Sequence, residues 1–321
     1  MPMPSMLRSL LVATAVAGLL AACRPAPTDV QVAAGSDLSR PALAVEVLAG
    51  HMRTGDFAAF ARDAVPPALH AQLGLAWRTG HTRWPLDELP FAEHLPTVLG
   101  TLAAPDAERT LAADFERQIA GSERELRAAA ATMGMFGVQY VEHQGDFSED
   151  ERDHYAQLVT AVAQWAATAP LADRSLARAA IPRLVAAARA AGPTTADGMA
   201  EAGMEASLQR LGAFSVTATD VLAGYGLDLD AALDSARASL QVQQGDRATV
   251  RLRYSLAGSP VDTVISVERI DGRWYLSDYL AHAREAVRSA GLPATPPASL
   301  PDSPPAPQPG PGAPAGPVAA P

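Results

Sequence analysis

The apolar residues of this chain change their spacing near Phe214, and this change limits the possible folds more than any other feature. Before that point they recur every three or four residues, which is the spacing of one buried helix face. After it, residues 248–254 alternate apolar and polar side chains, which is typical of a strand with one buried face. The sequence therefore predicts an α+β fold, with a predominantly helical body followed by a small antiparallel β-meander at the C-terminal end.

About six to eight helices are expected in the body. The main ones are placed at 42–62 (two short helices), 68–77, 106–133, 155–166, 176–188 with a kink at Pro182, and 204–211. The stretch 106–133 is expected to be one helix, although Gly121-Ser122 leaves open a break with a capping box. Ser148 and Glu151 form a clearer capping-box pattern, and Gly212 is expected to end the last of these helices.

The meander is expected to contain three to five strands. They are placed at 216–221, 239–243, 248–254, 261–269 and 273–279. Turns are predicted at Gly245-Asp246, at Gly258-Ser259-Pro260 and at Asp271-Gly272, and the last of these is the strongest hairpin signal in the chain. A short helix is expected within 228–237. Asp278 or a neighbour is expected to cap a final helix that ends near Ser289.

The first 22 residues have the three parts of a secretory signal peptide. Arg8 supplies a positive charge, an uncharged apolar run follows, and Ala21 and Ala22 precede Cys23, the one cysteine of the chain. The apolar run is too short to span a membrane as a helix, which needs about 20 residues. The sequence predicts cleavage between Ala22 and Cys23. An ordinary signal peptide cut nearby, with Cys23 incidental, is the alternative.

The stretch Leu20-Ala21-Ala22-Cys23 resembles the lipobox of bacterial lipoproteins. The resemblance implies diacylation of the Cys23 sulfur, for example with palmitate, and attachment to the membrane through this N-terminal acyl anchor. Several acyl chains hold a protein stably, because each buried CH₂ contributes about 0.8 kcal/mol. In that family an Asp after the cysteine favours the inner membrane. Arg24 therefore implies the outer membrane, with the body facing the periplasm.

The mature chain is acidic, because removing the first 22 residues takes away Arg8 and changes the net charge from −10 to −11. Nucleic acid is not an expected partner, since its phosphates are also negative. The expected units are a signal peptide (1–22), a lipidated N-terminus and tether (23–38), an α+β domain (39–291) with a helical insertion or lobe (75–212) and the meander with its terminal helix (214–289), and a disordered tail (292–321). The tail holds 12 of the 27 prolines, a composition that cannot bury a core.

Two segments resemble the NTF2-like/cystatin-like family of α+β domains. One is the helix pair at 42–62 with its break at Gly55-Asp56-Phe57, and the other is the hairpin at 266–276. The resemblance implies helices that wrap a curved antiparallel sheet and leave a cone-shaped pocket between them. It implies no catalytic residue, because the family shares no catalytic set. The candidate pocket residues are Tyr254, Trp274, Leu276 and Asp278.

The densest group of ionisable residues surrounds the turn before the helix at 155–166. It comprises Glu142, His143, Asp146, Glu149, Asp150, Glu151, Asp153 and His154. Such residues can hold a divalent cation, but their spacing matches neither an EF-hand nor an HExxH helix. Acidic residues also suit a helix N-terminus electrostatically. The sequence therefore predicts a solvated turn and helix cap, with no metal, no cofactor and no catalytic residue. A metal site is the alternative.

Function is predicted from placement, because no catalytic motif is recognised. We expect a non-catalytic role in binding or assembly with a periplasmic protein or another envelope partner, at the periplasmic face of the outer membrane. The alternatives are a small-molecule binding module that uses an NTF2-like pocket and, third, a hydrolase or isomerase with Asp278 as its base. The stretch 128–135, rich in alanine and methionine, is expected to pack in the core, and a partner-binding groove there is the alternative.

Overall fold

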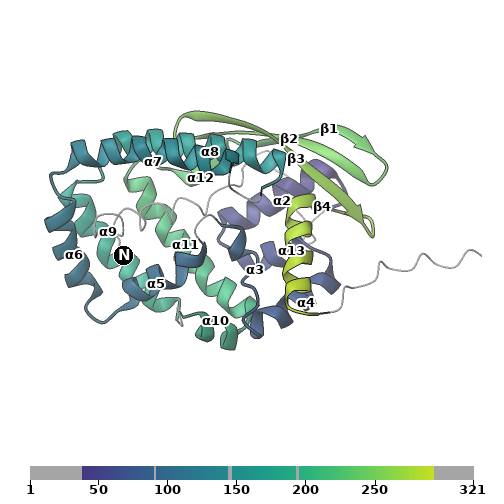
Figure 1. Ribbon diagram of the computed structural model, residues 1–321, viewed down its shortest axis with the longest axis horizontal. Coiled ribbons are helices and arrows are strands. Elements are labelled where there is room, and N and C mark those ends of the chain that lie inside the picture. Colours follow the sequence, from purple (N-terminus) through teal and green to yellow (C-terminus); the bar gives the residue numbers. More distant parts are fainter. Residues whose placement is uncertain (1–37, 90–91, 144–146, 193–194, 293–321) are drawn as a thin grey trace, which may run out of the picture.

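The computed structural model describes residues 38–89, 92–143, 147–192 and 195–292 (Figure 1). The expected signal peptide, Cys23, and nearly all of the tether and proline-rich tail lie outside the described residues. The predicted α+β class is confirmed. The helices are α2 (Pro41–Arg53), α3 (Phe57–Asp63), α4 (Pro67–Arg78), η1 (Leu86–Glu88), η2 (Ala92–His94), α5 (Leu95–Ala103), α6 (Ala107–Gln118), α7 (Glu123–His143), α8 (Glu149–Thr168), α9 (Arg174–Ala190), α10 (Ala196–Ala202), α11 (Met204–Gly224), α12 (Leu229–Asp234) and α13 (Ser277–Ser289).

Four antiparallel strands form a meander in the order β1 (Arg237–Gln244), β2 (Arg247–Leu256), β3 (Ser259–Ile270) and β4 (Arg273–Leu276). The short β4 pairs only with the last part of β3, so the rest of that edge needs another partner. Helix α8 supplies it. The side-chain amide of Gln157 donates to the carbonyl oxygen of Asp262 and accepts from its N–H, both at 2.9 Å. A side chain therefore replaces a neighbouring strand and protects the edge.

The alternating pattern of β2 is that of a half-buried strand, as expected. Val250 and Leu252 are buried against α2, α8 and α12, which cover one face of the sheet. Arg251 lies on the other face, where its guanidinium binds the carboxylate of Asp262 on β3. The sheet thus has one face in the core and one face in solvent.

A second core joins α3, α4, α5, α9, α11 and α13. Leu276 at the end of β4 contacts both cores, so the helical half and the sheet meet there. Figure 1 shows α7 and α8 side by side along one edge of the molecule, with α8 next to the sheet. No helix among the described residues is both long and apolar enough to cross a membrane.

The break between α2 and α3 contacts α11 through two glycines. Gly55 adopts a left-handed conformation (φ 66°), and Asp56 accepts a hydrogen bond from the N–H of Ala59 to begin α3. A Cβ atom added to Gly212 would lie 1.8 Å from the carbonyl oxygen of Gly55. The two backbones can therefore approach only because Gly212 has no side chain.

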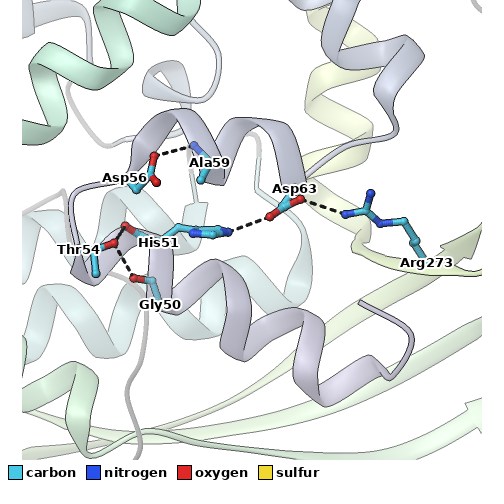
Figure 2. A network of polar contacts seen from close by, with 7 residues as sticks. All are labelled: Gly50, His51, Thr54, Asp56, Ala59, Asp63 and Arg273. Atoms are coloured by element: carbon cyan, nitrogen blue, oxygen red, sulfur yellow. Dashed lines mark hydrogen bonds and ion pairs between the residues drawn. The ribbon is translucent and has the colours of Figure 1, made fainter. Parts of the chain in front are cut away.

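A carboxylate then links this helix pair to the sheet. Asp63, at the end of α3, accepts from His51 of α2 at 2.9 Å and from Arg273 of β4 at 3.0 Å (Figure 2). Two consecutive helices and a strand 210 residues further along the chain thus share one partly buried anion. The position of α3 relative to β4 therefore depends on these polar bonds as well as on the apolar cores.

Two helix predictions are wrong. The expected helix at 106–133 is divided into α6 and α7, because Gly121 adopts a left-handed conformation (φ 80°) that ends the first segment. The expected end at Gly212 and the expected strand at 216–221 are both replaced by a continuous α11. Its β-branched residues favour a strand locally, but buried residues at helical spacing decide the outcome: Leu208, Leu211, Ser215, Ala218 and Leu222.

The turn predictions fare better. Asp271 and Gly272 both have positive φ (51° and 80°), as a two-residue hairpin turn requires, and Gly245-Asp246 joins β1 to β2 as expected. The turn expected at Gly258-Ser259-Pro260 instead uses Ala257 and Gly258, and β3 already begins at Ser259. Pro260 fits there because it lies near the start of the strand.

Candidate functional site

A cavity of about 80 Å³ lies where α2, α3, α8 and α13 meet the buried face of the sheet. Its apolar lining consists of Val45, Leu48, Ala49, Phe60, Leu252, Val264, Ile265 and Leu276. Its polar and aromatic lining consists of Asp150, Glu151, His154, Tyr155, Thr263, Asp278 and Tyr279. One water needs about 10–15 Å³ of such space, so the cavity has room for several waters or a compact ligand.

Thr263 is the exceptional group in this lining. The residue is 2 % exposed, and its Oγ1 has no hydrogen-bond partner among the described residues. An unpaired buried hydroxyl costs about 1–3 kcal/mol relative to one that is satisfied. A molecule in the cavity could supply the missing partner.

The N-terminus of α8 provides the acidic groups. The predicted capping box is confirmed: Ser148 Oγ accepts from the N–H of Glu151, and the Glu151 carboxylate accepts from the N–H of Ser148. Ser148 Oγ also donates to Asp278 at 3.1 Å. Burial raises the pKa of both Glu151 and Asp278, because two carboxylates are held where water is scarce.

His154 and Tyr254 form the buried polar pair of the cavity. His154 Nε2 lies 2.7 Å from the Tyr254 hydroxyl. Burial lowers the pKa of His154 to about 4, so the imidazole is neutral near pH 7. His154 lines the cavity, and the Tyr254 hydroxyl binds its imidazole from behind the lining.

Beyond the cavity lining, the acidic cluster continues to Glu88 of η1 and His282 of α13. Glu88 accepts from His282 Nδ1 at 2.6 Å, and this bond raises the pKa of His282 to about 9. One ligand atom each from Glu88, Glu151 and His282 lie within 4.8 Å of one another. Among the described residues, this group is the one whose geometry suits a metal ion.

The pocket residues expected from the sequence fall into three groups. Leu276 and Asp278 line the cavity, and Tyr254 contacts it through His154. Trp274 does not line it: its ring is buried in the sheet core beneath the guanidinium of Arg269. The expected capping role of Asp278 is also wrong, since its carboxylate binds Ser148 on another helix and α13 begins without a side-chain cap.

The acidic turn divides into two parts. Four residues are exposed, as a solvated turn and cap require: Glu142, His143, Glu149 and Asp153. Three instead line the cavity: Asp150, Glu151 and His154. For these three residues the prediction of a solvated turn and cap is wrong. They face inward because α8 packs against β3. Asp146 lies outside the described residues.

Comparison with family models, curated proteins and solved structures finds no match to this chain. Sequence reasoning missed Thr263, Glu88 and the pairing of His282, because each meets the cluster from an element distant in the sequence. The period-2 pattern of β3 was the one available signal, since it places Thr263 on the same face as buried Val261 and Val267.

Proposed function

We propose that this chain binds a small ligand in the cavity, as a lipid-anchored protein of the bacterial envelope. The observation that carries the binding proposal is Thr263, a buried hydroxyl without a described partner in the cavity lining. A ligand with one polar atom beside an apolar surface would pair this hydroxyl and cover the apolar wall. A pocket between helices and an antiparallel sheet is also what the NTF2-like resemblance implies.

The direct test is native mass spectrometry of the full-length protein, extracted with detergent from its own envelope. We expect a small molecule to be retained with the protein and released on unfolding. Protein that carries acyl mass but no such molecule, even when it is isolated at low detergent concentration, would contradict the proposed binding function.

Replacing Thr263 with valine should separate binding from stability. The substitution removes an unpaired hydroxyl and keeps the shape, so the free energy of unfolding without ligand should rise by about 1 kcal/mol. The same change should weaken retention of the ligand. Thr249→Val on the outward face of β2 is the matched control and should leave ligand retention unchanged. A variant that loses stability and keeps the ligand would exclude Thr263 from the binding site.

The anchor proposal rests on the lipobox-like stretch that ends at Cys23. Replacing Cys23 with serine removes the sulfur that would be acylated. The protein should then move from the membrane fraction to the soluble periplasmic fraction. Fractionation of cells with an antibody to the protein measures this, and unchanged membrane association would contradict the lipoprotein proposal.

A second candidate function is assembly with a protein partner through α7. Three large apolar residues on this helix are exposed: Met135, Phe136 (69 % exposed) and Tyr140. The expectation that 128–135 packs in the core is therefore wrong for most of the stretch, of which only Ala130 is buried. Phe136 and Tyr140 are one turn apart on one helix face, which suits a groove or another helix as partner. Co-extraction of a protein in the same mass spectra, lost in Phe136→Ser, would support this function.

A further inference from the structure

The three groups around Glu88 converge from separate parts of the fold. Glu88 ends η1, Glu151 lies in the first turn of α8, and His282 lies in the middle of α13. Glu88 has a side-chain exposure of 8 %, so its carboxylate is held inside the protein. Two carboxylates and one imidazole, offered from three elements, are a ligand set for a divalent metal ion.

We propose that Glu88, Glu151 and His282 bind a divalent first-row transition metal ion, with zinc as the working probe. Nitrogen and oxygen ligands lie about 2.0–2.2 Å from zinc, so two ligand atoms on one ion are at most about 4.4 Å apart. The three ligand atoms here already lie within 4.8 Å of one another. Binding therefore requires only small side-chain movements and the loss of the proton between Glu88 and His282.

The surrounding charges favour a cation. Three carboxylates gather here, from Glu88, Glu151 and Asp278, and His282 is the positive group bonded to Glu88. Glu151 and Asp278 both accept hydrogen bonds from Ser148, which carries no charge. A divalent ion would supply the missing positive charge.

The neighbours of the ligands are already oriented. The backbone N–H of Ser148 donates to the Glu151 carboxylate at 2.9 Å, and its hydroxyl donates to Asp278. Such bonds fix the direction of a ligating carboxylate and are typical of the shell around metal ligands. Glu151 would therefore pay little entropy on binding because the cap restrains it in advance.

A separate observation points to an occupant. Glu151 and Asp278 line the same cavity as Thr263, whose buried hydroxyl has no partner in the described part of the chain. A metal ion with three protein ligands keeps an open position for water or for a ligand. Of the three proposed ligands, Glu151 lines this cavity of about 80 Å³, and Thr263 is a polar group in its wall.

The test uses the full-length protein after treatment with a chelator, titrated with Zn²⁺ alone in a calorimeter and with Co²⁺ in a visible spectrometer. We expect one Zn²⁺ ion per chain and a visible Co²⁺ absorption band that grows until one Co²⁺ ion per chain has been added. His282→Gln and Glu88→Gln each remove a direct ligand and should weaken Zn²⁺ binding by at least about 10- to 100-fold, the cost of losing only an outer-shell partner.

The exposed pair Glu142 and His143 supplies a matched control. It also places a carboxylate near an imidazole, at 3.9 Å, but the metal group does not include it. His143→Gln should leave Zn²⁺ affinity unchanged. Because Glu88→Gln could disturb folding, Glu88→Asp is the second variant, and circular dichroism checks both. Zn²⁺ binding that is absent, or equal in wild type and His282→Gln, would overturn the proposal.

Discussion

Replacing Gly212 with alanine should lower the free energy of unfolding by about 3 kcal/mol, since overpacking at a site that cannot relax is among the costlier substitutions. The new methyl carbon would lie 1.8 Å from the carbonyl oxygen of Gly55. The backbone of α11 fixes the position of this carbon and the oxygen is itself a backbone atom, so neither can rotate away and α11 must move from the α2–α3 break. Urea denaturation followed by circular dichroism measures the change.

Gly50→Ala is the matched control for this substitution. Gly50 also lies within a helix, but an added Cβ would meet nothing within 4 Å. Alanine favours a helix over glycine by about 1 kcal/mol, so this variant should be more stable than wild type. If Gly212→Ala were also stabilised, the close contact between Gly55 and Gly212 would be wrong.

The protein should lose about 3 kcal/mol of stability between pH 6.5 and pH 4 through His154 alone. Burial lowers the pKa of His154 from 6.5 to about 4 in the folded protein. Over this range the unfolded chain takes up a proton and the folded chain does not, so stability falls by about 1.4 kcal/mol per pH unit. The contribution is fully present above pH 6.5 and is lost by about pH 4.

His154→Gln should flatten this part of the pH profile. Glutamine is uncharged throughout and can still hydrogen-bond to the hydroxyl of Tyr254. The measurement is the urea midpoint of both proteins from pH 7.5 to pH 4. The difference between the two profiles removes the contribution of the other titrating groups. His143→Gln, at an exposed position, should follow wild type. A His154→Gln profile as steep as that of wild type would show that the imidazole is not buried in its neutral form.

Features that depend on neighbouring residues were predictable. The Ser148–Glu151 capping box, the Asp271-Gly272 turn and the alternation of β2 each arise from contacts within a few residues, and all three are confirmed. Gly212 shows the limit of such reasoning. Glycine weakens a helix locally, so a helix end was expected there, but its function is to admit the backbone of Gly55 from far away.

The candidate site was predictable only in part, for the same reason. Leu276 and Asp278 lie at the junction of β4 and α13, where the hairpin pattern already indicated a pocket wall. Glu151 was predicted to lie in a solvated helix cap. That prediction is wrong because charge alone does not show which side of a helix packs on a sheet. The residues next to Glu88 and His282 in the sequence give no sign that the two form a pair, because they are 194 residues apart.

The contact between Asp63 and Arg273 also bears on how the chain folds. Along with the bond from the Trp274 N–H to the carbonyl oxygen of Leu38, it joins the beginning of the described chain to its last strand. Folding rates fall as contacting residues become more distant in sequence, because long loops must close first. The bonds between this N-terminal part and β4 can therefore form only once most of the described chain has been brought together. These contacts raise the contact order of a mostly helical protein, so we expect it to fold more slowly than a helical bundle of the same length.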